Sequence, residues 1–81
     1  MTDYTPIDCD RYSEYELAIL RKWRLRLGWR DGAGLTHVET VLPTDLQTRL
    51  GEEFLIAKTS AGERVEIRLD LITEAKPRSE D

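Results

Sequence analysis

The first part of the chain carries hydrophobic residues at helical spacing. Tyr12, Tyr15 and Ile19 recur at intervals of three and four, with Ala18 beside them. This spacing is typical of a helix that buries one face against the rest of a domain. Leu17 lies off the stripe, where it has two interpretations: burial against a second contact, or a small apolar spot on an exposed binding surface.

Polar residues at the start of this segment indicate where the helix begins. Ser13 is followed three residues later by Glu16, which fits a capping box that satisfies free backbone N–H groups. Asp10 is an alternative, earlier cap. The sequence therefore predicts a short helix over about residues 13–21.

After this helix the hydrophobic period changes to two. Apolar residues alternate with basic ones from position 22 to position 30, the apolar set being Trp23, Leu25, Leu27 and Trp29. Such alternation predicts a strand with one buried face, which here carries both Trp rings. The Asp31-Gly32-Ala33-Gly34 run supplies residues that suit a hairpin turn, so a second strand is expected over 35–42.

The remaining segments predict further short strands. Pro43 is expected to end the second strand because it cannot donate to a ladder, and 44–52 then forms a polar connection with one optional helical turn at 45–47. A third strand is predicted at 54–59 and a turn at 60–63. The fourth strand follows from the alternation of Val65, Ile67, Leu69 and Leu71, and a bend near position 70 would open a fifth.

These elements make one small, mainly β domain. We expect it to span residues 1–75, with the strands within 22–73 and a frayed, charged tail at 76–81. Four or five short strands can curl into a strongly bent sheet or small barrel capped by the helix. The pattern alone does not separate an Sm-like barrel from an SH3-like or OB type.

Charge is abundant and unevenly distributed along the chain. Charged residues make up 35% of the 81 positions, and the formal net charge is −4. The first twenty residues hold five carboxylates against one arginine, whereas residues 21–30 hold five basic residues and no acid. This distribution has two explanations. Either the protein presents one acidic and one basic face, or a solvated helix and a solvated strand simply neutralise each other's charge. The net charge favours a basic protein partner over free nucleic acid.

Simple counts argue against catalysis and cofactors. Cys9 and His37 are the sole residues of their types, so no Cys/His zinc set exists and no nucleophile–base spacing stands out. We expect Cys9 to be a small packed side chain and His37 an ordinary strand residue. The 31–34 turn lacks the Lys of a phosphate loop. With no basic and apolar leader and no apolar run of membrane length, the sequence predicts a soluble cytoplasmic protein that binds no metal or cofactor.

Two segments resemble one known family. Residues 4–12 and 16–18 read Tyr-x-Pro-Ile-x-Cys-Asp-x-Tyr and Glu-Leu-Ala, and residues 53–57 and 66–73 are similar to the paired C-terminal strands of the same family. The pattern resembles the Rof family, small bacterial proteins that bind the transcription termination factor Rho and inhibit it. The resemblance implies an Sm-like barrel with one N-terminal helix.

The resemblance also implies a partner and a site. Rho is a ring-shaped RNA helicase whose N-terminal OB-type domains hold single-stranded RNA in basic, aromatic-lined clefts. An acidic helix surface would occupy those clefts, block RNA loading and so cause antitermination without any reaction, and the protein would act as a monomer that does not itself bind nucleic acid. The residues expected to contact Rho are Asp8, Asp10, Tyr12, Ser13, Glu14, Glu16 and Leu17.

Two rival hypotheses remain at this point. The first is a small Sm-like module that binds RNA directly through Arg24, Arg26 and Arg30, since basic residues interleaved with aromatics suit single-stranded RNA. Against it, period two places the Trp rings on the face opposite the arginines, and the net charge is negative. The second is a module of this fold that docks on some other basic protein.

Overall fold

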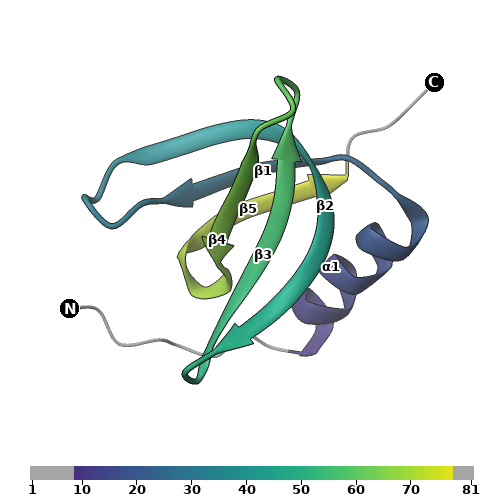
Figure 1. Ribbon diagram of the computed structural model, residues 1–81, viewed down its shortest axis with the longest axis horizontal. Coiled ribbons are helices and arrows are strands. Elements are labelled where there is room, and N and C mark those ends of the chain that lie inside the picture. Colours follow the sequence, from purple (N-terminus) through teal and green to yellow (C-terminus); the bar gives the residue numbers. More distant parts are fainter. Residues whose placement is uncertain (1–8, 78–81) are drawn as a thin grey trace.

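The computed structural model describes residues 9–77, which form one helix and a single five-stranded antiparallel sheet (Figure 1). The elements in chain order are α1 (Cys9–Arg21), β1 (Leu25–Arg30), β2 (Thr36–Arg49), β3 (Glu52–Thr59), β4 (Arg64–Arg68), the 3₁₀ turn η1 (Leu69–Leu71) and β5 (Ile72–Pro77). The predicted class, mainly β with one N-terminal helix, is confirmed.

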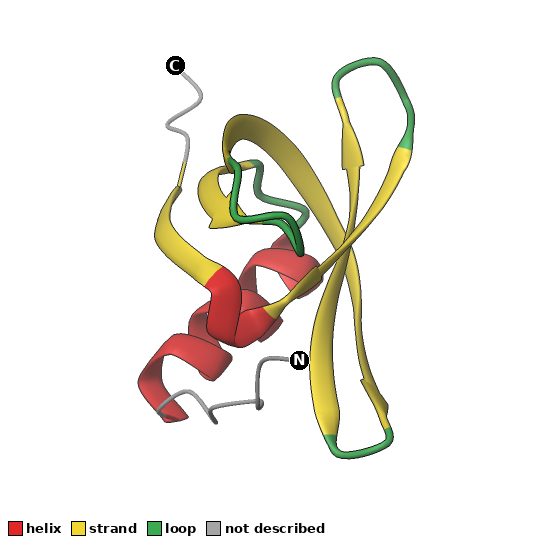
Figure 2. Ribbon diagram, turned by 90° about the vertical axis from the view of Figure 1, so that its left-hand side faces the viewer, coloured by secondary structure: helices red, strands yellow, loops and turns green. Residues whose placement is uncertain are grey.

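The sheet is strongly bent. Its strand order is β4-β3-β2-β1-β5, so β4 and β5 form its two opposite edges. Only the three residues of η1 join these edges, and three residues span no more than about 11 Å. The edges must therefore approach one another, which requires a curled sheet, and Figure 2 shows β2 and β3 sweeping across the molecule in long curves. The strands do not close into a complete barrel, since β4 and β5 do not pair.

Helix α1 begins earlier than the capping box predicted. It starts at Cys9, so Ser13 and Glu16 lie inside the helix and the predicted cap at Ser13 was wrong. Asp10 lies in the first turn, where a carboxylate interacts favourably with the free N–H groups of the helix start. The longer helix also brings Tyr12 into contact with the core.

The helix ends in a Schellman motif built on a lysine. The Trp23 N–H donates to the Ala18 carbonyl at 2.9 Å, the Lys22 N–H donates to the Ile19 carbonyl at 3.3 Å, and Lys22 has a φ of 58°. This reversal delays the first strand to Leu25. Trp23 therefore lies outside β1 and is 39% exposed, so the prediction that both Trp rings are buried was wrong for Trp23 and correct for Trp29.

The longest strand continues through the position where a break was predicted. Pro43 lies inside β2 and is buried, and the ladder with β3 shifts register between Pro43 and Asp45. A bulge of this kind accommodates a residue that has no N–H to donate. The predicted polar connection over 44–52 was therefore wrong, as was the optional helical turn: the strand runs on to a two-residue turn at Leu50 and Gly51, both with positive φ.

The other turns agree with the sequence. In the β1–β2 hairpin, the Asp31 carboxylate accepts hydrogen bonds from the Ala33 and Leu35 N–H groups and contacts His37 Nε2 at 2.7 Å. His37 stacks on Trp29, with ring centroids 5.3 Å apart. The turn between β3 and β4 is closed by a hydrogen bond from the Thr59 N–H to the Glu63 carbonyl.

The predicted bend near position 70 is the 3₁₀ turn η1. Arg68 holds it through two hydrogen bonds to the Asp70 carboxylate, at 3.0 and 2.7 Å. The following strand reaches Pro77, so Lys76 and Pro77, expected in the tail, pair with Arg26 and Leu25 of β1. Residues 78–81 lie outside the described part.

The core lies between α1 and the inner face of the sheet. Tyr15 and Ala18 supply the helix side, and Tyr12 and Ile19 pack at its margin, which confirms the predicted stripe. The strands and η1 supply the rest, and its fully buried members include Leu27, Val41, Leu55, Ala57 and Leu69.

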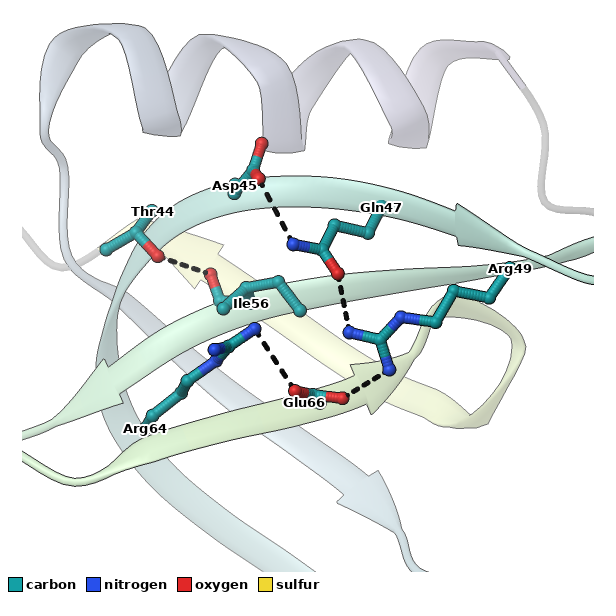
Figure 3. A network of polar contacts seen from close by, with 7 residues as sticks. All are labelled: Thr44, Asp45, Gln47, Arg49, Ile56, Arg64 and Glu66. Atoms are coloured by element: carbon teal, nitrogen blue, oxygen red, sulfur yellow. Dashed lines mark hydrogen bonds and ion pairs between the residues drawn. The ribbon is translucent and has the colours of Figure 1, made fainter.

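A polar network crosses the outer face of β2, β3 and β4 (Figure 3). Arg49 donates to Glu66 at 2.6 Å and to Gln47, while Arg64 contacts the other Glu66 oxygen at 3.1 Å. The hydrogen bond with Arg49 lowers the pKa of the Glu66 carboxyl below its ordinary value. The network therefore ties β2 to β4 across β3 on the solvent side of the sheet.

Candidate partner-binding surface

The predicted site residues lie on α1 and expose most of their side chains. Asp10, Ser13, Glu14 and Glu16 are exposed, and Leu17 is 38% exposed. Tyr12 is half-buried at the margin of the core. Asp8 lies outside the described residues, so its place relative to the others stays a prediction.

Helix geometry divides these carboxylates between two flanks. Residues two apart are separated by about 200° around an α-helix, so Glu14 and Glu16 point in nearly opposite directions. Asp10 lies four residues before Glu14 and shares its flank. Glu16 lies four residues after Tyr12 and shares the other. The acidic surface is therefore not one cluster; it has two arms, with Ser13 and Leu17 on the ridge between them.

The Tyr12 flank includes a residue that the sequence did not single out. Burial is the largest cause that raises the pKa of the Tyr12 phenol above its ordinary value, and the negative charges of Glu53 and Glu16 raise it further. The phenol is thus protonated at neutral pH and available as a hydrogen-bond donor beside two carboxylates. Glu53 comes from β3, and no local pattern indicated its approach to α1.

The Glu14 flank borders an apolar groove. The groove has a volume of about 210 Å³ and lies where α1 meets the ends of β1 and β5; its lining residues are Glu14, Tyr15, Leu17, Trp23, Leu25, Ala75 and Pro77. The guanidinium of Arg21 lies 5.6 Å from the centre of the Trp23 ring. Leu17 is therefore a partly exposed apolar side chain next to an acid, and its place on a binding surface stays a prediction.

The second half of the helix adds further exposed apolar surface. Leu20 is 78% exposed, and it lies one turn after Leu17. Leu17, Leu20 and Trp23 form a small apolar strip. It continues the ridge of Ser13 and Leu17 toward the end of the helix. Sequence reasoning missed Leu20 because its position follows neither the buried stripe nor the acidic run.

Cys9 and His37, the two residues considered for metal or nucleophile chemistry, have the following surroundings. Within residues 9–77, no group of three or more His, Cys, Asp or Glu side chains could hold a metal ion. Cys9 is exposed at the start of α1, so the expectation that it is packed was wrong: the earlier helix start places it on the outer side. His37 is a strand residue, as predicted. No helix among the described residues is long and apolar enough to cross a membrane.

Comparison with known proteins identifies the family. The family model described as "Modulator of Rho-dependent transcription termination (ROF)" matches residues 6–81. The chain is 40% identical over 70 residues to "Protein rof" from Escherichia coli (strain K12), an alignment that covers 86% of this chain and 77% of that protein. "Protein rof" from Shigella flexneri matches to the same extent. The two-ended resemblance in the sequence is thereby confirmed, and the chain belongs to the ROF family of modulators of Rho-dependent transcription termination.

Proposed function

We propose that this protein binds the N-terminal RNA-binding domain of Rho through the exposed surface of α1 and thereby blocks RNA loading. The observation that carries the proposal is the exposure of Asp10, Glu14 and Glu16 on the two flanks of α1. Tyr12 lies at the margin of the core beside this surface, where the charges of Glu53 and Glu16 raise the pKa of its phenol. Rho's clefts attract the phosphates and bases of RNA, and this surface offers negative charge and an aromatic donor in their place. The binding surface consists of Asp8, Asp10, Tyr12, Ser13, Glu14, Glu16 and Leu17, to which we add Glu53.

The two arms of the surface have different tasks in this proposal. The Tyr12 arm combines an aromatic ring with charge, which is the combination that gives specific contacts at the centre of interfaces. The Glu14 arm adds the groove with Leu17 and Trp23, which receives an apolar side chain of the partner. The proposed action is occupancy of the RNA site: the free protein is a cytoplasmic monomer that changes no bond and does not bind RNA itself.

Displacement of RNA from Rho tests this function directly. A fluorescent pyrimidine-rich RNA is bound to purified Rho, and the protein is titrated in while anisotropy is recorded. We expect the RNA to be released as the protein saturates Rho. RNA that stays bound while the protein also binds Rho would contradict the proposed mode of action.

A variant of β1 separates this function from direct RNA binding. Replacing Arg24, Arg26 and Arg30 with Gln removes three exposed charges, one just before β1 and two on the face of β1 that points away from the core. If the acidic surface of α1 makes the contact, the variant binds Rho in the absence of RNA as well as the parent protein does. Loss of Rho binding with an unchanged circular dichroism spectrum would place the working surface on β1 instead.

A further inference from the structure

The outer face of the sheet gathers basic residues that are far apart in the sequence. The register pairs Arg26 of β1 with Lys76 of β5, and Lys58 of β3 with Arg64 of β4. Residues directly opposite in an antiparallel pair share one face. β2 links the two pairs, because Arg26 lies opposite Thr40, Lys58 lies opposite Leu42, and these two β2 residues are two apart.

This face points away from the core. Leu25 and Leu27 on either side of Arg26 are buried, as is Ala57 before Lys58, so the basic side chains project outward. Arg30 lies four residues after Arg26 on the same side of β1. We define the cationic face as Arg26, Arg30, Lys58, Arg64 and Lys76, all of which are exposed.

Few acids neutralise the cationic face. Within residues 9–77, Arg26, Arg30 and Lys58 have no ion-pair partner, whereas Arg64 contacts Glu66 and Lys76 lies 4.0 Å from Glu74. These three cations, two on β1 and one on β3, form a local positive surface in a chain whose formal net charge is −4. Such a surface attracts a polyanion at close range even though the whole molecule repels one at long range.

The long-range repulsion depends on the acidic surface of α1. On α1, Asp10, Glu14 and Glu16 carry three negative charges, in a chain whose formal net charge is −4. A basic partner that covers them leaves the cationic face as the dominant source of electrostatic potential. We infer that the cationic face is a second docking site, for the phosphate backbone of single-stranded RNA, which operates once a basic partner neutralises the acidic surface.

The chemistry of the face favours backbone contact over base recognition. On this side of β3 the Phe54 ring is already covered by the Arg49 guanidinium, 5.2 Å from the ring centre. Trp29 is buried on the other side of the sheet, and Trp23 lines the groove next to α1. Bases therefore find no stacking platform, and binding draws on counterion release at phosphates alone. In the setting of the proposed function, on which the inference builds, the RNA displaced from Rho would be held at low affinity and without sequence preference.

A Rho-free experiment tests the inference separately from the proposed function. The variant Asp10→Asn/Glu14→Gln/Glu16→Gln mimics the neutralised surface, and its binding to fluorescent pyrimidine-rich RNA is measured by anisotropy from 20 to 200 mM salt. We expect no binding by the parent protein and salt-dependent binding by this variant. Failure of the neutralised variant to bind at the lowest salt would overturn the inference, while the displacement assay on Rho would be unaffected.

Two matched pairs of substitutions locate the contact in the same background. Arg26→Gln/Lys58→Gln removes two charges from the cationic face, and Arg21→Gln/Lys22→Gln removes two from the end of α1. We expect only the first pair to reduce the slope of log affinity against log salt, by about 1.4, because each phosphate contact on a single strand contributes about 0.7. Equal reductions by both pairs would show a diffuse charge effect and refute a defined face.

A second probe separates RNA from acidic proteins. The neutralised variant is also titrated with poly-glutamate of the same total charge as the RNA. We expect weaker binding to poly-glutamate, because each carboxylate stands on a flexible side chain whose ordering costs conformational entropy, whereas the phosphates are part of the RNA backbone. Equal or tighter binding to poly-glutamate would assign the face to an acidic protein and overturn the assignment to RNA.

Discussion

Replacing Lys22 with Gly is expected to stabilise the protein. Lys22 occupies the C′ position of the Schellman motif with a φ of 58°, where an L-residue costs about 1–2 kcal/mol. Glycine removes that penalty but costs about 0.4–1 kcal/mol through the greater freedom of the unfolded chain. The difference leaves a net stabilisation of about 1 kcal/mol, because Lys22 is exposed and makes no ion pair within residues 9–77 that would be lost.

Thermal unfolding followed by circular dichroism measures this effect. For a domain of this size, about 1 kcal/mol corresponds to a rise of about 4–8 °C in Tm. Arg21→Gly is the matched control: it lies one residue earlier, inside the helix, and should lower Tm because glycine costs about 1 kcal/mol there. An unchanged or lower Tm for Lys22→Gly would refute the assignment of strain to this position.

Three further outcomes are expected. Rho binding weakens steeply from low to high salt, because charges exposed on α1 are screened within about 10 Å at 0.1 M; an affinity that hardly changes would indicate an apolar interface. Glu14→Lys/Glu16→Lys abolishes Rho binding in pull-down while circular dichroism shows an intact helix, since Glu16 lies mid-helix and caps nothing; the single reversals show which flank dominates. His37 and the Leu35 and Ala33 N–H groups lower the pKa of Asp31, so its stabilising contribution is present above about pH 4 and is lost as pH falls; Asp31→Asn should flatten the Tm profile below pH 4, and an unchanged profile would contradict this.

The sequence correctly predicted those elements whose conformation is determined by residues close together in the chain. The stripe through Tyr15 and Ala18 predicted the buried helix face, and the residues at 31–34 and 60–63 predicted their turns. The predictions that were wrong concern residues whose conformation depends on other parts of the structure. Pro43 is tolerated because β2 bulges directly after it, where β2 pairs with β3. Trp23 lies outside the sheet because the backbone reverses at Lys22.

The candidate surface follows the same division. Glu14 and Glu16 were visible as part of an acidic run, but their separation onto two flanks required the helix to be placed against the sheet. Glu53 reaches Tyr12 only because β2 and β3 form one long hairpin beside α1, a pairing that no short pattern encodes. The partner was therefore inferred from the family resemblance, whereas the arrangement of the individual side chains became known only from the structure.

The strand order has a consequence for how the chain folds as it is synthesised. β1 lies between β2 and β5, so Leu27 must pair with Ala75 near the other end of the chain. Before β5 leaves the ribosome, one edge of β1 has no partner and the core lacks Leu69 and Ile72. Contacts that join the first and last strands are slow to form because the whole intervening loop must be ordered first. The domain is thus expected to reach its native state only once β5 has left the ribosome, with α1 and the long β2–β3 hairpin forming ahead of the complete sheet.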